Sequence, residues 1–256
     1  GAADCRCLRP LRGAVVKLRV LFFDAVGTLF RVRGSVGQVY SQVAAEYGVR
    51  VDPQALDRAF GQVFAQAPAP ACPGLTGSPL REWERTWWRQ VVRETFARVG
   101  SLAAFGEHRF EDFFAQLFEH FAGADPWELY PETLPALRAL QQEGIRLGVI
   151  SNFDSRLPRV LQQLQLDPYF SSLTLSTQVG YAKPDPRIFQ AALAAHGIPP
   201  AAAGHIGDSR REDYQGAKAA GLRALWLDRE GKDSSCPERI EDLWGSLSML
   251  NGPKQN

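Results

Sequence analysis

Three polar side chains stand at the ends of segments that we expect to be β-strands, where they could bind or attack a ligand. Asp24 follows the apolar run 18–23, Ser151 ends a second such run, and Asp208 follows a third segment. A carboxylate can serve as a nucleophile or as a ligand for a hard cation, and a hydroxyl can donate to a bound oxygen. One such residue alone would indicate a turn, because turns favour Asp and Ser. Three of them at strand ends favour a common site.

Lys183 is a fourth candidate, and it stands out because lysine is rare in this chain. Lysine occurs only at positions 17, 183, 218, 232 and 254, and the other basic residues are mostly arginine. A lysine just before Pro184 therefore indicates a need for a compact ammonium instead of a planar guanidinium. A solvated loop lysine is the alternative. Lys183 also directly precedes the expected helix 185–196, which places it near the same sheet edge.

The elements that must position these groups alternate between strands and helices after Tyr130. The expected strands are 18–23, 145–151, 172–176, 204–207 and 222–227. The expected helices are 132–143, 155–165, 185–196, 210–220 and 238–249. This alternation is typical of an α/β fold with a doubly wound, Rossmann-like parallel sheet and helices on both faces. Ligands bind at the carboxyl ends of the strands in such sheets, which is where the candidate residues stand.

A helical segment interrupts this pattern after the first strand. The spacing of apolar residues predicts helices at 36–47, 53–66, 79–99 and 107–122, and the Pro/Gly-rich stretch 67–79 is expected to be a loop. We therefore expect an α/β core made of 18–31 and 128–256, with an α-helical domain at 32–127 inserted into it. Trp83, Trp87 and Trp88 either line a pocket or, as is commoner for an aromatic stripe, pack inside this insertion.

Four short motifs follow one another along the chain. They are Asp24-Ala-Val-Gly-Thr-Leu29, Ile150-Ser151-Asn152, Lys183-Pro184, and the stretch from Gly207 to Asp213 with two acids separated by four residues. In this order they resemble the four signatures of the haloacid dehalogenase superfamily. The resemblance covers residues 18–228, and the helical insertion matches the position of that family's cap domain.

The resemblance implies a hydrolase that depends on Mg²⁺. Asp24 would attack phosphorus and form an aspartyl-phosphate, which water then hydrolyses. Mg²⁺ would be held by Asp24, the backbone carbonyl of Val26 and Asp208, with Asp213 as a direct or water-mediated ligand. Three carboxylates near an anionic substrate repel one another unless a cation lies among them, and hard oxygen ligands suit Mg²⁺.

The resemblance also implies how the substrate is held. Ser151 and Lys183 would bind the phosphoryl oxygens, together with backbone N–H groups near Ala25 and Asn152. Most of the catalysis would then be positioning and charge stabilisation. The implied partner is a small phosphorylated metabolite.

Position 26 departs from the family pattern. Phosphatases of the superfamily usually carry a second Asp two residues after the nucleophile, where it protonates the leaving group and then activates water. Val26 can do neither, and general acid–base catalysis is typically worth about 10²–10⁴-fold. A phosphatase with this sequence would be slow, would use a group from the cap, or would act on a substrate with a good leaving group.

Two other functions stay open at this point. A 2-haloacid dehalogenase needs only the carboxylate nucleophile, because halide leaves without a proton. The family's dehalogenases work without metal and lack the first acid of the fourth motif, so Asp208 and Asp213 argue against this function. A phosphate-binding or regulatory protein with little turnover is the other alternative. The presence of Asp24, Ser151 and Lys183 together with both acids favours an enzyme.

Composition narrows the partners and the compartment. The chain has 256 residues and a net charge of +1, which gives no reason to expect nucleic acid or an anionic membrane as a partner. No apolar run approaches the roughly 20 residues that cross a bilayer. Four cysteines indicate a reducing, cytoplasmic location. An organelle such as a plastid is the alternative if residues 1–17 are the remnant of a transit peptide and not a disordered extension.

Overall fold

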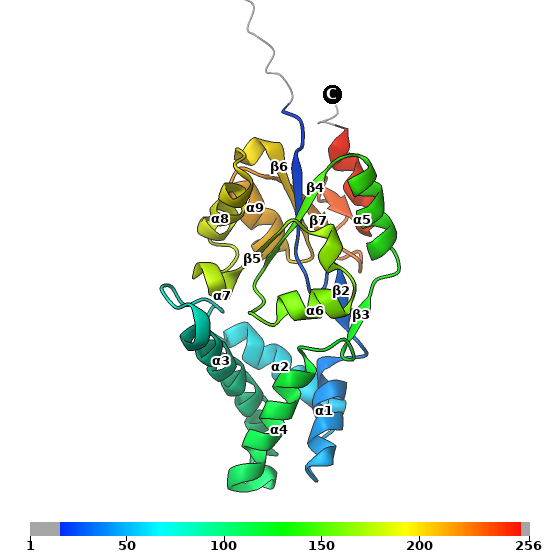
Figure 1. Cartoon of the computed structure of the whole chain (residues 1–256). Coiled ribbons are helices and arrows are strands. Elements are labelled where there is room, and N and C mark those ends of the chain that lie inside the picture. The colour runs from blue at the N-terminus through cyan, green and yellow to red at the C-terminus, as the bar shows by residue number, and fades with distance from the viewer. Residues whose placement is uncertain (1–15, 252–256) are drawn as a thin grey trace, which may run out of the picture.

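The computed structural model describes residues 16–251, and a six-stranded parallel sheet forms its core (Figure 1). The expected extension 1–17 lies almost entirely outside the described residues. The strand order is β5-β4-β1-β6-β7-β8, and each neighbouring pair is parallel. The strands are β1 (Val20–Phe23), β4 (Arg146–Ser151), β5 (Ser172–Leu175), β6 (Ala203–Gly207), β7 (Arg223–Leu227) and β8 (Arg239–Ile240). The expected doubly wound, Rossmann-like α/β fold is confirmed.

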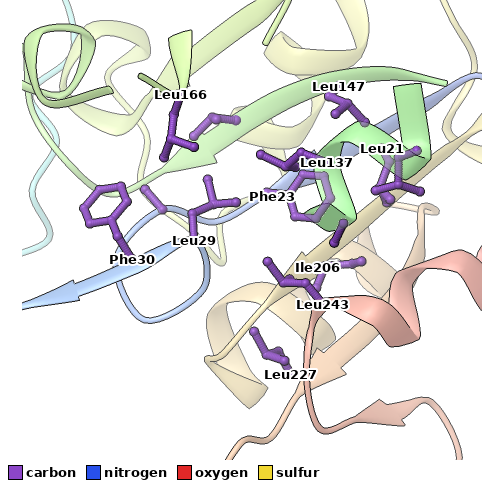
Figure 2. Packing of buried hydrophobic residues seen from close by; sticks show 14 of the residues in the cluster. Leu21, Phe23, Leu29, Phe30, Leu137, Leu147, Leu166, Ile206, Leu227 and Leu243 are labelled. Atoms are coloured by element: carbon purple, nitrogen blue, oxygen red, sulfur yellow. The ribbon is translucent and has the colours of Figure 1, made fainter. Parts of the chain in front are cut away.

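Helices cover both faces of this sheet. The helices of the core are α5 (Thr133–Gln142), α6 (Leu157–Gln163), α7 (Ser176–Val179), α8 (Pro186–His196) and α9 (Gly216–Ala219). Side chains alternate along β1, so Leu21 and Phe23 pack on the α5–α6 face, whereas Val20 and Phe22 pack on the α8–α9 face. Figure 2 shows Leu21 and Phe23 beside Leu137 of α5. A strand buried on both faces is a continuous apolar run, as β1 is.

A group of helices follows the first strand and lies at one end of the molecule, away from α5, α8 and α9 (Figure 1). Its elements are α1 (Val36–Glu46), α2 (Pro53–Gln66), α3 (Gly77–Arg98), the 3-10 turn η1 (Leu102–Phe105) and α4 (Gly106–His120). The Ser35 and Asp52 side chains cap the first two helices by accepting backbone N–H bonds. Phe96 packs edge-on against Phe105 and Phe113 inside the group. Within the described residues, no helix combines the length and apolar character that a membrane crossing needs.

A two-stranded antiparallel ribbon joins the helical group to the core. Its strands are β2 (Phe30–Val32) and β3 (Trp127–Leu129), at the points where the chain leaves the core and returns to it. The sequence did not predict this ribbon, because a three-residue strand is too short to show a periodicity. The expected boundaries at 31/32 and 127/128 fall inside the ribbon, and the division into core and cap stays a proposal.

The last expected helix, at 238–249, is wrong. The chain instead adds the short strand β8 to the sheet edge and continues as the 3-10 segment η5 (Leu243–Leu250), whose first turn is capped by the Asp242 carboxylate. The apolar residues of this segment have helical spacing, but Gly245 packs against Ile240 with no room for a side chain. Residues 210–220 also differ, since they begin with the π-turn η4 (Arg210–Gln215) before α9.

Candidate active site

The three candidate residues at strand ends meet at one edge of the sheet. β1 lies between β4 and β6, and Phe23 at its end is in register with Val149 and Ile206. Asp24, Ser151 and Asp208 therefore follow neighbouring strands at nearly the same level, as the sequence predicted.

Lys183 lies at the centre of the site and uses its whole ammonium group there. Its Nζ donates to Asp24 Oδ1 at 2.8 Å, to the Ile150 carbonyl at 2.9 Å and to Asp213 Oδ1 at 2.6 Å. Lys183 is only 4% exposed. Burial alone would lower the pKa of Lys183, but the carboxylates of Asp213 and Asp24 raise it overall, so the group stays charged. The prediction that this lysine belongs to the site agrees with its position. Its three donors hold protein acceptors, one of which is the proposed nucleophile.

Asp213 is held from several sides and balances the charge of Lys183. Its Oδ1 also contacts His205 Nε2 at 2.8 Å, and its Oδ2 accepts the Ser209 N–H at 3.0 Å. Burial raises the pKa of Asp213, but Lys183 and the His205 hydrogen bond lower it overall. A Cβ at Gly207 would lie 2.1 Å from the Asp213 Cγ, so glycine is required where β6 ends.

Three carboxylates converge and fit a hard cation. Oxygens of Asp24, Asp208 and Asp213 lie within 4.8 Å of one another. Desolvation by the surrounding protein, followed by the charges of Asp24 and Asp213, raises the pKa of Asp208 to about 8, although the residue is exposed to solvent on one side. Burial also raises the pKa of Asp24, against the effect of Lys183. A divalent cation would relieve this repulsion, and carboxylate oxygens are the ligands that Mg²⁺ prefers.

The turn after β1 brings Asp24 and Asp208 together. Gly27 has a φ of 89°, and a Cβ there would lie 2.4 Å from Asp208 Oδ2, so the turn needs glycine for its backbone and for its space. Thr28 donates its hydroxyl to Asp24 Oδ2 at 3.1 Å and so orients the carboxylate. Val26 lines the same cavity as Asp24 and Asp208. Its carbonyl stays a predicted metal ligand.

Ser151 and Asn152 have different positions in the site. Ser151 is buried, lines the cavity and accepts the Phe153 N–H at its Oγ, which leaves the hydroxyl hydrogen for a ligand. The Asn152 amide is occupied with the backbone of Lys183, since its Oδ1 accepts the Lys183 N–H at 2.8 Å and its Nδ2 donates to the Lys183 carbonyl at 3.2 Å. The Asn152 side chain therefore positions Lys183, and only its backbone stays a predicted donor to a substrate.

A cavity of about 360 Å³ lies over this site. We call its polar lining, together with the polar groups directly behind that lining, the floor. The lining part consists of Asp24, Ser151, Asn152, Asp208, Ser209 and Glu212, and the groups behind it are Thr28, Lys183 and Asp213. We call the lining from the helical insertion the roof. It consists of Val32, Val36, Tyr40, Phe60, Phe64, Trp88, Val92, Phe114, Leu117, Phe118 and Phe121. The open question about the tryptophans is thereby answered in part. Trp88 belongs to the roof, whereas Trp87 packs on Phe64 and donates to the Pro68 carbonyl.

Sequence reasoning missed the charged pair at the wall of the cavity. Arg156 lines the cavity, and its Nε and Nη2 donate to the two carboxylate oxygens of Asp154 at 2.9 and 2.7 Å. A signal was present, because Asp154 and Arg156 follow closely on the strand that ends at Ser151. Arg31 pairs with Glu128 of the ribbon.

Known proteins place this site in a family. Residues 18–221 match the model of a family of hydrolases described as haloacid dehalogenase-like hydrolase. The chain belongs to the haloacid dehalogenase-like hydrolases. The resemblance inferred from the four motifs is thereby confirmed. The chain is 35% identical over 248 residues to the Bos taurus haloacid dehalogenase-like hydrolase domain-containing protein 3. The match covers 93% of this chain and 96% of that protein.

Proteins similar to this chain in sequence or in fold carry names of different activities. A phosphoserine phosphatase of Thermus thermophilus is 34% identical over 172 residues, or 67% of this chain and 65% of that protein. The crystal structure of a 2-haloacid dehalogenase from Pseudomonas syringae pv. Tomato DC3000 superposes with a TM-score of 0.63 at 22% identity, over 91% of this chain and 98% of that one. The fold is thus shared with a protein named as a dehalogenase, and the sequence is similar to one named as a phosphatase, so the side chains of the site must distinguish between the two activities.

Proposed function

We propose that the protein is a Mg²⁺-dependent phosphatase that hydrolyses a small organic phosphate through an aspartyl-phosphate at Asp24. The observation that carries the proposal is the floor itself, where three carboxylates converge beside a buried lysine and a serine hydroxyl. A group of charges this dense is suited to a cation and an anionic substrate together. Asp24, Asp208 and the Val26 carbonyl would hold Mg²⁺, with Asp213 as a direct or water-mediated ligand, and the ion would neutralise charge on the phosphoryl group.

The residues of the floor would divide the reaction between them. An oxygen of Asp24 attacks phosphorus, the bond from phosphorus to the ester oxygen breaks, and the alcohol leaves with a proton from solvent. Water then attacks the aspartyl-phosphate, which releases inorganic phosphate and restores the carboxylate. Lys183 and Thr28 hold Asp24 in position for the attack. The Ser151 hydroxyl donates to a phosphoryl oxygen, and Lys183 would reach one by exchanging a protein acceptor.

A 2-haloacid dehalogenase is the second candidate, and two features favour it. Val26 supplies no acid, but halide leaves without one, and the roof would suit the apolar side chain of a haloacid. The convergence of Asp208 with Asp24 opposes it, because a second carboxylate without a cation would repel a carboxylate substrate.

An assay of the purified protein tests the proposal. It would be offered phenyl phosphate, acetyl phosphate and a panel of sugar phosphates, each with Mg²⁺ or with a chelator. We expect release of phosphate that the chelator abolishes and added Mg²⁺ restores. Halide release from 2-haloacids without phosphate release would support the dehalogenase instead. No turnover of either class would support a binding or regulatory protein.

A further inference from the structure

The roof offers almost nothing to a polar substrate. Every roof residue is apolar or aromatic, and Tyr40 alone among them carries a hydroxyl. The indole N–H of Trp88 already donates to Asp154 Oδ2 at 2.7 Å. A sugar enclosed beneath this surface would lose water from its hydroxyls and find few partners, which is costly for buried polar groups. An aromatic ring would instead stack among Phe60, Phe118 and their neighbours.

The charged pair of Arg156 and Asp154 at the wall of the cavity does not provide a binding site for a second anion. Arg156 is the one cationic side chain among the described residues that line the cavity. Asp154 neutralises Arg156 by accepting two hydrogen bonds from its guanidinium. The Nη1 of Arg156 also donates to the Phe118 carbonyl at 3.0 Å. Its guanidinium also lies over the Phe118 ring, 3.8 Å from the centroid. The charge is therefore balanced and partly covered, whereas a specific carboxylate site would keep the guanidinium fork open.

Position 26 points to the same substrates for a separate chemical reason. Without an acid there, the ester oxygen must leave unprotonated or with little protonation. A phosphate ester whose leaving group is stable as an anion is therefore hydrolysed faster. A phenol, with a pKa of about 10, is a much better leaving group than an ordinary alcohol. The missing acid and the aromatic roof thus favour one chemical class.

We propose that the substrate is a phenolic phosphate whose organic part carries no further charge, with the phosphoryl group on the floor and the aromatic ring under the roof. This rests on the proposed phosphatase function and specifies its substrate class. The aspartyl-phosphate step is unchanged, and the group released with the ester oxygen is a phenol.

Three matched substrates test the leaving-group argument and the argument about a second anion separately. Phenyl phosphate and cyclohexyl phosphate have similar size and apolar character but differ in leaving group. We expect kcat/KM to be at least about 10²-fold higher for phenyl phosphate. Adding a carboxylate in 4-carboxyphenyl phosphate should lower kcat/KM, because Arg156 is already neutralised. Val26→Asp should reduce the ratio of phenyl to cyclohexyl phosphate by about tenfold or more, since it supplies the missing acid.

A pair of Phe variants tests the roof. Phe60→Leu should raise KM for phenyl phosphate about threefold or more, since a ring contact is lost. Acetyl phosphate has a good leaving group but no ring, so its kinetics should change less than about twofold by the same argument. Phe110→Leu removes a buried ring of the insertion that is not part of the lining of this cavity, and should leave the kinetics of both substrates unchanged. Equal or faster hydrolysis of cyclohexyl or sugar phosphates would overturn the proposed substrate class and leave the phosphatase standing. Failure to hydrolyse phenyl and acetyl phosphate alike would overturn both.

Discussion

The floor and the roof of the cavity consist of different kinds of side chain, and substitutions in them should have different effects. The floor lies at the carboxyl ends of the parallel strands, where the strand ends and the segments beside them bring charged groups to hydrogen-bond distance. Lys183 donates to both Asp24 and Asp213 there. The roof comes from the inserted helices and consists of aromatic and aliphatic side chains. Charged groups in fixed geometry can bind and transform an anion, whereas an apolar surface selects a shape and excludes water.

The floor therefore indicates the family, whereas the roof indicates the individual substrate. The floor contains the four motifs, which lie within the residues 18–221 that match the family model, and the roof residues lie between the first two motifs in the sequence. Changes in the floor should therefore abolish turnover or unfold the core. Changes in the roof and at its contacts with the core should alter affinity or stability by smaller amounts.

The largest effect should come from the nucleophile. Asp24→Asn keeps the shape of the side chain but removes the attacking carboxylate, so kcat should fall by about 10⁴-fold or more. Steady-state phosphate release measures this, and a thermal melt checks that the variant is folded. Turnover within tenfold of the wild type in a folded variant would remove Asp24 from the mechanism and leave the floor as a binding site.

Removal of Lys183 should damage both activity and folding. Lys183→Met leaves two buried carboxylates facing each other, and losing one partner of a buried ion pair costs about 3–5 kcal/mol. Urea denaturation would measure the free energy of unfolding. Lys183→Arg keeps the charge and should still not restore the protein, because Lys183 is only 4% exposed and a planar guanidinium does not reproduce the three contacts of its ammonium. A stable Lys183→Met variant with normal kcat would show that the ammonium is dispensable.

These floor residues were accessible from the sequence, and the reason is geometric. A polar residue at the end of an apolar strand is fixed in space once the sheet is parallel, so Asp24, Ser151 and Asp208 could be placed together without coordinates. The sequence did not show that Lys183 donates to Asp24. That contact depends on a loop whose backbone is held by the Asn152 amide, and side-chain contacts of this kind leave no periodic pattern.

The roof could be predicted from the sequence only in part. Helical spacing placed its helices within about two residues of their ends, but spacing does not say which apolar face packs inward and which lines a cavity. Trp87 and Trp88 are adjacent in sequence and have different environments. The error at 238–249 has a related cause, because apolar spacing cannot distinguish an α-helix from a short strand followed by 3-10 turns.

A buried carboxylate that joins the helical insertion to the core should give an intermediate effect. Glu84 of α3 is 3% exposed and accepts hydrogen bonds from the Ser155 N–H and hydroxyl at 3.1 and 2.8 Å, and from the Thr177 hydroxyl. Glu84→Ala would leave these donors unpaired and should cost about 1–3 kcal/mol in unfolding free energy.

Glu84→Gln is the control for that variant, because its amide oxygen can still accept. It should be clearly more stable than Glu84→Ala in the same denaturation experiment. If the two variants have equal stability, the contact between α3 and the loop after β4 contributes only through packing, and the polar link between the helical insertion and the core has no energetic role.

The smallest effect should come from Arg31, in the ribbon that connects the two regions. Its contact with Glu128 Oε2 at 3.1 Å is solvent-exposed, with 56% and 40% of the two side chains accessible. Exposed ion pairs contribute about 0–1 kcal/mol, so Arg31→Ala should barely change the unfolding free energy. Because Arg31 is outside the cavity lining, KM for phenyl phosphate should also stay within about twofold, since exposed charges act weakly at a distance. A selective rise in KM at constant stability would mean that Arg31 reaches the substrate, and the cavity would then carry a positive charge that the roof, as described, does not supply.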